Sequence, residues 1–394
     1  MQKQYVTEEK TRMAFLVTIL ESKGESGREI RGLTESLGLQ IANHELIHVR
    51  EKNAKFGIGT GKAAELAEKA VAIKADCMIL DWNPSPSQQR NWEEISGIPV
   101  LDRQEVIIRI FAERAKTREA ALQVKLAELS YLLPRLTHKY IDLSRQRGGR
   151  YGTRGSGETR LETDRREIEK RIHTLEKELK QVAMQRQVRR QQRERFGLPV
   201  CAIVGYTNSG KSSLMNALTG AGVLVEDKLF ATLDATTRRF EPEPGTQALL
   251  TDTVGFIRNL PHSLIKAFRS TLEEATRADL LIHVLDASDP EIDSFYETTL
   301  SVLRELGAEE IPTITVLNKI DRLAQGEAQA ENNLSRFQGE LAISALKGTG
   351  LDELKKQIVA ILKEHHEGSL RPLGSAEVQQ ERNLRSLGSA EVPQ

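Results

Sequence analysis

The sequence predicts an α/β protein with two parallel-sheet domains and a long antiparallel helical hairpin between them. Short apolar runs alternate with amphipathic helical segments in residues 1–111 and again in residues 196–366, a pattern typical of parallel strands joined by crossover helices. Between these regions, apolar residues recur at intervals of three and four, the period of a helix that buries one face. A chain of 394 residues is long enough for two or three such domains.

Composition and charge narrow the class of protein. Apolar residues make up 39% and charged residues 28% of the chain, as in globular domains. Cys77 and Cys201 show neither metal-ligand spacing nor a disulfide framework, which favours a reducing, cytoplasmic compartment. No apolar run approaches the ~20 residues that span a bilayer, and the N-terminus lacks a signal-peptide pattern. The net charge is zero, yet residues 135–200 hold 18 Lys or Arg against 9 Asp or Glu, so this segment is strongly basic.

The first domain, residues 1–111, is expected to be a small α/β unit. Its predicted strands are residues 13–19, 45–49 and 77–81, and its predicted helices are residues 28–39 and 61–74. The glycine-rich FGIGTGK at 56–62 precedes a helix but has Phe56 where a phosphate-binding loop needs glycine and Ala63 where it needs a hydroxyl. We interpret this stretch as a turn that opens a helix.

Residues 112–195 are predicted to form the helical hairpin. Leucines at helical spacing mark the first helix, which Pro134 closes: Leu122, Leu126, Leu129 and Leu133. A coiled-coil-like seam marks the second helix: Ile168, Ile172, Leu175, Leu179 and Val182. The Gly/Arg-rich residues 144–159 are expected to be the connecting loop. Arginine among glycines beside an aromatic suits contact with RNA phosphates and bases, and the predicted contacts are Arg145, Arg147, Arg150, Tyr151 and Arg154.

The third unit, residues 196–366, is predicted to be a doubly wound sheet that begins with a P-loop. Gly205-x4-Gly210-Lys211-Ser212 follows a strand and precedes a helix, which is the context a phosphate-binding loop needs. Lys211 would reach the β- and γ-phosphates, and Ser212 would offer its hydroxyl to Mg²⁺. The predicted phosphate-binding residues are Gly205, Tyr206, Thr207, Asn208, Ser209, Gly210, Lys211, Ser212 and Ser213.

Further polar motifs end other predicted strands. Asp252 in DTVG can hold a magnesium-bound water and Gly255 can sense a γ-phosphate, so the predicted switch II is Asp252, Thr253, Val254 and Gly255. In VLNKID, the Asp321 carboxylate can accept two hydrogen bonds from guanine that adenine cannot donate. The predicted guanine-binding residues are Asn318, Lys319, Ile320, Asp321, Ser344, Ala345 and Leu346. Together these motifs predict a domain that binds GTP and GDP.

A mobile threonine that ligands Mg²⁺ is expected between the P-loop and DTVG. Thr232, Thr236 and Thr237 compete for this role. We favour Thr232, because about twenty residues separate it from Asp252 and leave room for an antiparallel strand, TTRRFEP, and a turn at 244–245. The predicted switch I is Phe230, Ala231, Thr232, Leu233 and Asp234.

The order of these parts resembles the HflX family of ribosome-associated GTPases. The likeness covers nearly the whole chain, including PSPSQQRN (84–91), residues 111–136, GTRGSGETRLETDRR (152–166), GYTNSGKS, LFATLD, DTVGFIRNLPH (252–262), NKID and SAL. The resemblance implies a GTP hydrolase that binds the large (50S) ribosomal subunit and its rRNA and splits stalled ribosomes, with the hairpin reaching the peptidyl-transferase region. The resemblance also supports Thr232 as the threonine that ligands Mg²⁺. It departs at residues 367–394, a polar tail expected to be disordered, where many members have a folded domain.

Two residues bear on catalysis. Phe256 follows Gly255, where GTPases often carry a glutamine, and it has no polar atom to orient water, so we expect slow intrinsic hydrolysis that ribosomal particles stimulate. Asn208 lies where potassium-activated translation GTPases carry an asparagine, so a K⁺ ion could neutralise charge between the β- and γ-phosphates. The cross-charged hairpin seam favours a monomer. The alternative function is a GTP-regulated RNA-binding ribosome assembly factor with incidental hydrolysis.

Overall fold

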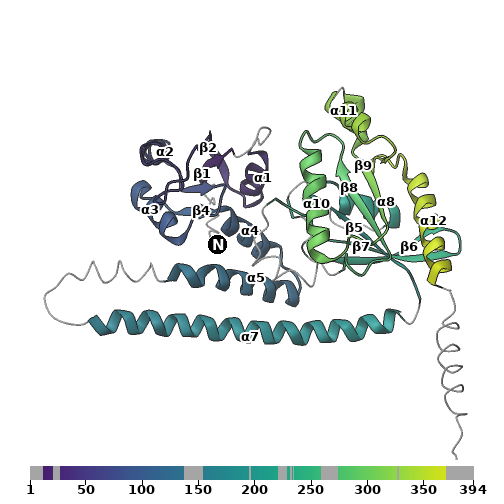
Figure 1. Cartoon of the computed structure of the whole chain (residues 1–394), viewed down its shortest axis with the longest axis horizontal. Helices are drawn as coiled ribbons and strands as arrows, with labels where there is room; N and C mark the ends of the chain where they lie inside the picture. Colours follow the sequence, from purple (N-terminus) through teal and green to yellow (C-terminus); the bar gives the residue numbers. More distant parts are fainter. Residues whose placement is uncertain are drawn as a thin grey trace, which may run out of the picture.

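The structure is a computed structural model that describes residues 12–20, 27–136, 154–194, 197–220, 229–230, 233, 235–258, 274–325 and 328–369. Two sheet domains stand side by side, and a pair of long helices runs beneath them (Figure 1). Four of the predicted RNA-contact residues, the tip of the predicted hairpin and the polar tail from residue 370 lie outside the described residues. No helix in the described part of the chain combines the length and the apolar character that a membrane span needs.

The N-terminal domain is a parallel four-stranded sheet with strand order β2-β1-β3-β4. Its strands are β1 (Met13–Ile19), β2 (Gln40–Ile47), β3 (Cys77–Leu80) and β4 (Val100–Asp102). Its helices are α1 (Arg28–Ser36), α2 (Thr60–Ala72) and α3 (Pro86–Ser96). Phe15 and Met78 of the sheet form one buried cluster with Leu66 of α2 and Trp92 of α3, so the sheet is covered on this face.

Three features of this domain differ from the sequence prediction. The strand predicted at 45–49 is β2, which starts at Gln40. β2 is an edge strand, and its first half mixes Gln40 and Asn43 with the partly exposed Ile41 and Ala42, so that half lacks a continuous apolar run. The helix α3 and strand β4 were not predicted. The start of α3 is a capping box, in which Ser85 accepts the N–H of Gln88 and the Gln88 side chain accepts the N–H of Ser85.

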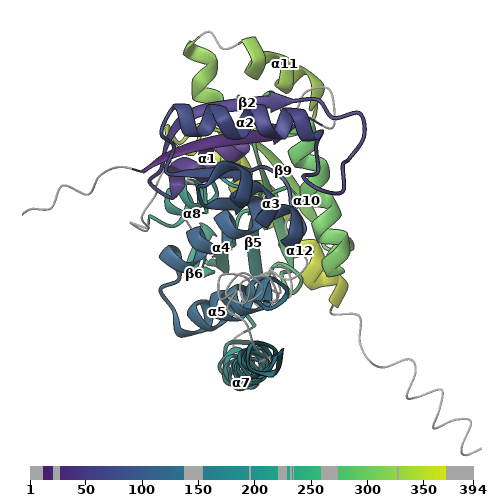
Figure 2. The same ribbon diagram turned by 90° about the vertical axis from the view of Figure 1, so that its left-hand side faces the viewer.

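In the described part of the chain between the domains, the α-helices are α4 (Arg103–Arg114), α5 (Arg118–Leu132) and α7 (Arg154–Glu194). Because Thr117 caps α5 by accepting the N–H of Ala120, the single helical stretch predicted before Pro134 is two helices. In Figures 1 and 2, α5 lies between the N-terminal domain and α7. Glu119, at the start of α5, lies 3.6 Å from Arg186 near the end of α7, so the two helices run antiparallel.

The loop predicted at 144–159 is wrong for residues 154–159, because α7 begins at Arg154. Once a helix has formed, extending it by one residue orders only that residue and gains one hydrogen bond. The glycines at this end therefore do not stop the helix. Along the predicted seam of α7, Leu175 is 1% exposed and the other four positions are partly buried. The seam therefore faces α5, as the heptad-like spacing predicts.

The C-terminal domain is a six-stranded sheet in the order β10-β9-β8-β5-β7-β6, with only β6 antiparallel to its neighbour. Its strands are β5 (Val200–Gly205), β6 (Thr236–Glu243), β7 (Thr246–Asp252), β8 (Leu280–Asp286), β9 (Thr313–Asn318) and β10 (Leu341–Ala342). Its helices are α8 (Lys211–Thr219), α10 (Ile292–Leu306), α11 (Ala328–Arg336) and α12 (Leu351–Ser369). The core cluster on one face includes α10, and that on the other includes α8 and α12, which is the predicted doubly wound architecture.

A buried apolar cluster continues from the N-terminal domain into the C-terminal domain. It joins Leu33 of α1 and Phe111 of α4 to Phe230, Val254 and Phe256 of the predicted switch regions. The two domains are therefore packed together, through α1 and α4, beside the predicted phosphate site.

Candidate active site

The predicted P-loop, residues 205–212, connects β5 to α8, and two of its glycines have no room for a side chain. A Cβ on Gly205, at φ 145°, would stand 2.3 Å from the Val284 carbonyl oxygen. One on Gly210, at φ 94°, would stand 2.2 Å from Asn318 Nδ2. Such backbone conformations and close approaches are available to glycine alone. The loop is thus held tightly against the carboxyl ends of β8 and β9.

The P-loop lysine is buried within this turn. Lys211 is 6% exposed and its Nζ donates to the Tyr206 carbonyl oxygen at 2.6 Å. Burial lowers its pKa to about 8, because a buried ammonium loses hydration. The hydroxyls of Thr207 and Ser209 are also buried, without a hydrogen-bond partner among the described residues. Buried donors of this kind suit a loop that binds a polyanion.

Two oxygen groups meet at the start of α8, where Ser212 Oγ donates to Asp252 Oδ2 at 2.6 Å. Asp252 ends β7 and is 0% exposed. Within the described residues, no three His, Cys, Asp or Glu side chains gather as a metal site. A hydroxyl and one carboxylate nevertheless fit Mg²⁺, which in such sites is also held by waters and by substrate phosphates. A GTPase domain carries a requirement for this ion, and Ser212 and Asp252 are the described residues that would hold it.

Switch II lies directly against the P-loop. A Cβ on Gly255 would stand 2.8 Å from Thr207 Cα and 2.9 Å from Lys211 Nζ. The next residue, Phe256, donates its N–H to the Gly205 carbonyl at 3.1 Å and accepts the Thr207 N–H at 2.9 Å. The Phe256 side chain is 2% exposed and belongs to the cluster between the domains. The sequence SLIKAFRSTLEEATR at 263–277 predicts a helix onto which Phe256 could pack, and most of it lies outside the described residues.

Switch I is described only in part. Phe230 has φ 57° and packs edge to face on Phe111, with ring centroids 4.6 Å apart. Leu233 is buried, whereas Ala231, Thr232 and Asp234 lie outside the described residues. The competing threonines, Thr236 and Thr237, are residues of β6. Thr232 as the magnesium threonine stays a prediction.

The predicted guanine site brings two chain segments together. Asn318 donates to the Ser209 carbonyl at 2.9 Å and accepts the Ala345 N–H at 3.0 Å. Asp321 accepts the Ser344 hydroxyl at 2.6 Å, and the Ile320 N–H donates to the Ile343 carbonyl. Leu346 is 82% exposed. The Ala345 N–H thus positions Asn318.

Sequence reasoning missed one carboxylate of this site. Asp286 Oδ2 lies 2.7 Å from Lys319 Nζ, which also donates to the Asn208 carbonyl oxygen at 2.7 Å. Asp286 ends the apolar strand β8, so the rule that found Asp252 and Asn318 could have found it. These contacts fix Lys319, whose φ is 67°, between the P-loop and the predicted base site.

Three family models match this chain along its length. A GTP-binding GTPase N-terminal model matches residues 24–112, and a GTP-binding GTPase middle-region model matches residues 114–193. A model described as a 50S ribosome-binding GTPase matches residues 200–319.

Curated relatives match most of the chain. GTPase HflX of Akkermansia muciniphila is 47% identical over 366 residues, covering 89% of this chain and 84% of the relative. GTPase HflX of Escherichia coli is 42% identical over 330 residues, covering 84% and 77%. A solved GTP-binding protein of Sulfolobus solfataricus in complex with GDP is 26% identical and aligns over 90% of this chain and 99% of its own, with a TM-score of 0.45. On the strength of the relatives and the three family models, the chain belongs to the HflX family of GTPases and is a GTP hydrolase.

Proposed function

We propose that this GTPase binds the large ribosomal subunit and uses GTP binding and hydrolysis to split ribosomes into subunits. The observation that carries the proposal is the match of residues 200–319 to the model described as a 50S ribosome-binding GTPase. GTP-ordered switches would favour the docked state, and hydrolysis would release the protein. The proposed domain division is 1–111, 112–195, 196–366 and 367–394.

The helix α7 supports a contact with RNA at a distance from the GTPase sheet. Its 41 residues span about 60 Å at 1.5 Å per residue. Exposed charges along it pair locally, with Arg165 2.9 Å from Glu169 and Arg166 2.6 Å from Glu162. Local pairing offsets part of the charge on this helix, and we assign the RNA contact to Arg145, Arg147, Arg150, Tyr151 and Arg154 in the glycine-rich segment that leads into it.

Slow hydrolysis by the free protein is part of the proposal. The Phe256 side chain is apolar and buried between the domains, so it cannot orient the attacking water. A ribosomal partner that orders the switch regions would align the water and complete the site. The site residues predicted for GTP and Mg²⁺ are proposed to act as the sequence motifs indicate.

We also propose that K⁺ assists hydrolysis at Asn208. Its side chain is exposed at the surface of the P-loop, and its φ is 60°. A cation there would neutralise charge that develops between the β- and γ-phosphates. GTP turnover in K⁺ and in Na⁺ at matched ionic strength tests this. Equal rates, or a K⁺ effect that survives Asn208→Ala, would contradict it.

The main experiment measures GTP turnover by the full chain with 30S, 50S or 70S particles, and in parallel the sedimentation of 70S ribosomes. We expect the 50S subunit to raise turnover at least about tenfold and the GTP-bound protein to convert 70S particles to subunits. Replacing Arg145, Arg147, Arg150 and Arg154 by glutamine should remove both effects. Replacing two exposed lysines of α12 by glutamine, Lys356 and Lys363, is the control. It should leave the stimulation of turnover and the splitting of 70S particles intact.

The alternative, an assembly factor with incidental hydrolysis, predicts a different result. It expects binding to the 50S subunit that depends on the same arginines but no GTP-dependent splitting of 70S particles. Binding without splitting would therefore overturn the splitting function, while absence of both would overturn the ribosomal assignment.

A further inference from the structure

We propose that Glu29, on helix α1 of the N-terminal domain, is a positioning residue for the GTPase reaction. It holds switch II against the P-loop in a conformation that an incoming γ-phosphate has to displace. This inference rests on the GTPase activity alone and does not depend on the ribosomal function.

The Glu29 carboxylate reaches two parts of the GTPase site. Its Oε1 accepts the hydroxyl of Tyr206, the second residue of the P-loop. It also accepts the backbone N–H of Arg258 at 3.3 Å, and the same N–H lies 2.8 Å from the Tyr206 hydroxyl. Arg258 comes two residues after Phe256, so one carboxylate oxygen joins the P-loop to the segment that follows switch II.

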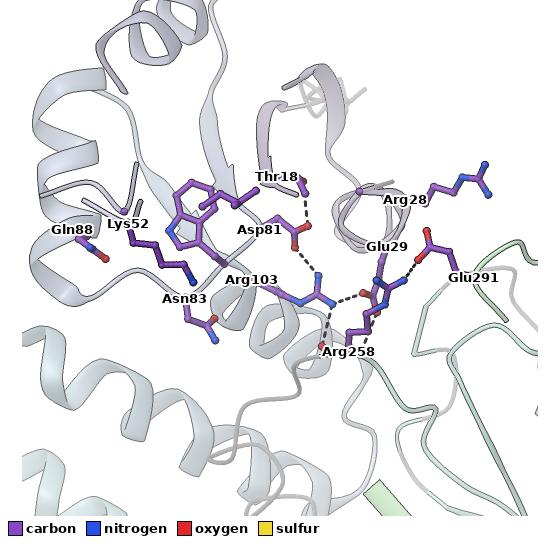
Figure 3. Close-up of a pocket in the computed structure, with 14 residues that line it drawn as sticks. Thr18, Arg28, Glu29, Lys52, Asp81, Asn83, Gln88, Arg103, Arg258 and Glu291 are labelled. Atoms are coloured by element: carbon purple, nitrogen blue, oxygen red, sulfur yellow. Dashed lines mark hydrogen bonds and ion pairs between the residues drawn. The ribbon is translucent and has the colours of Figure 1, made fainter. Parts of the chain in front are cut away.

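A buried arginine fixes Glu29 in place. Arg103 donates to Glu29 Oε2 at 2.6 Å, to the Arg258 carbonyl at 3.2 Å and to Asp81 Oδ1 at 2.7 Å. Figure 3 shows this chain of contacts, which continues from Asp81 to Thr18 at 3.2 Å and from Arg258 to Glu291. The Arg103 side chain is 5% exposed, so removing the charge of Glu29 would leave Asp81 as the carboxylate that compensates this buried guanidinium.

The phenol of Tyr206 is held as firmly as its partner. Its ring stacks on Phe295 of α10, with centroids 3.8 Å apart and planes 9° from parallel. Burial, and then the charge of Glu29, raises its pKa well above the ordinary value, so the phenol stays protonated and donates.

What these contacts maintain is the close packing of switch II on the P-loop. Gly255 lies so near Lys211 that a Cβ would stand 2.9 Å from its Nζ. In a P-loop enzyme this lysine meets the γ-phosphate, which the switch II glycine senses through its N–H. Gly255 lies beside that lysine here, so in our proposal a γ-phosphate that reaches Lys211 displaces switch II, whereas GDP does not.

Switch I has an anchor on the same domain. Phe230 packs on Phe111 of α4 in a left-handed conformation, which is unfavourable for a bulky residue and persists only where packing imposes it. The neighbouring Leu229 lies against Gly32 of α1, where a Cβ would stand 3.1 Å from its Cδ1. Both switches are therefore held by the N-terminal domain in this conformation.

The consequence is a bias in nucleotide preference. A ligand shifts a two-state equilibrium only by its differential affinity for the two states. If Glu29 stabilises the state in which Gly255 blocks the γ-phosphate, weakening its contacts raises the affinity for GTP and leaves the affinity for GDP unchanged.

The test compares Kd values of the full chain for GDP and for a non-hydrolysable GTP analogue, without ribosomes. Glu29→Gln keeps the size and the acceptor oxygen but removes the charge that pairs with Arg103. We expect the analogue to bind about five- to tenfold more tightly, with GDP affinity within twofold. Glu94→Gln, an exposed surface carboxylate on α3, is the matched control and should change neither value.

Tyr206→Phe supplies a second variant that keeps the stacked ring and removes only the hydroxyl. It should also favour the GTP analogue over GDP, and its effect should not add to that of Glu29→Gln, because both break one contact. A merely structural role would lower the melting temperature and change both affinities together. An unchanged ratio of the two Kd values in both folded variants overturns the proposal.

Discussion

Two glycine-rich turns precede helices in this molecule, and only one has the features of a phosphate site. In the N-terminal domain, FGIGTGK leads into α2, and in the GTPase domain GYTNSGKS leads into α8. Both turns place a lysine near the start of a helix and belong to domains built on a mainly parallel sheet. They differ in what surrounds that lysine.

In the first turn the lysine points to solvent. The Lys62 side chain is 40% exposed and pairs with Glu65 at 2.8 Å, and the positions of Gly59 and Gly61 have open space around them. In the second turn, Lys211 is buried beside Asp252 and Gly255. A glycine-rich turn is thus a phosphate site only where neighbouring strand ends bring buried polar groups to it.

The largest expected effect tests this difference directly. Lys211→Ala should lower GTP turnover by about a thousandfold or more, because no other described cation replaces a buried P-loop lysine at the transferred phosphate. Lys62→Ala should leave turnover within twofold. Steady-state GTPase assays on both variants measure this. A substantial loss with Lys62→Ala would break the comparison by giving the N-terminal turn a role in the reaction.

The next effect concerns the base. Asp321→Asn replaces a double acceptor for guanine with a group that also donates, so GTP affinity should fall at least about a hundredfold. Xanthosine triphosphate, whose base has a carbonyl in place of the guanine amino group, should become the preferred nucleotide. Competition binding with both nucleotides checks this. Retention of guanine preference would place base recognition elsewhere.

A smaller effect is expected from pH. Burial holds the Lys211 pKa at about 8, below its ordinary 10.5, and phosphate binding requires the charged form. Below pH 8 the ammonium is already protonated, so GDP affinity should be flat. Above pH 8 binding must take up a proton, so affinity should fall by up to about tenfold per pH unit. Titration calorimetry in buffers of different ionisation enthalpy measures the proton uptake, which should be absent in Lys211→Met.

The smallest expected effect is a gain in stability, not a loss of function. Gly61 lies within α2 and nothing stands within 4 Å of a Cβ placed on it. Gly61→Ala should therefore stabilise the protein by about 0.5–1 kcal/mol, because alanine loses less backbone freedom in a helix. A higher free energy of unfolding in denaturant, together with unchanged GTP turnover, would support this. A lower free energy of unfolding would indicate that Gly61, like the P-loop glycines, has a close neighbour that leaves no room for a side chain.

Much of the fold was predictable because local signals were strong. The strands β5, β7, β8 and β9 are apolar runs that end in polar residues, so the strands themselves followed from the sequence, as did the doubly wound architecture. The helix α3 was missed although its start, Ser85 to Gln88, is a readable capping signal. The break before α5 was missed because no glycine or proline marks it, and the local signal is the Thr117 cap.

The contacts between the domains could not be predicted. Glu29 meets Tyr206 across 177 residues and Arg258 across 229, and no local pattern distinguishes it from an ordinary charge on the surface of a helix. Likewise, the sequence motif identifies Phe230 as a switch residue, but its packing on Phe111 depends on how the two domains are arranged. Long-range pairing of this kind depends on the tertiary arrangement and leaves no periodic trace.

The length of α7 has a mechanical consequence. Its C-terminal end leads within a few residues into β5, the strand that ends at the P-loop, and Arg186 near that end lies 3.8 Å from Glu274 of the GTPase domain. A helix of about 60 Å acts as a lever arm. A rotation of about 5° at its base moves the far end by roughly 5 Å, close to one helical turn. A small angular change at the start of β5 can thus become a large displacement at the far end of the helix.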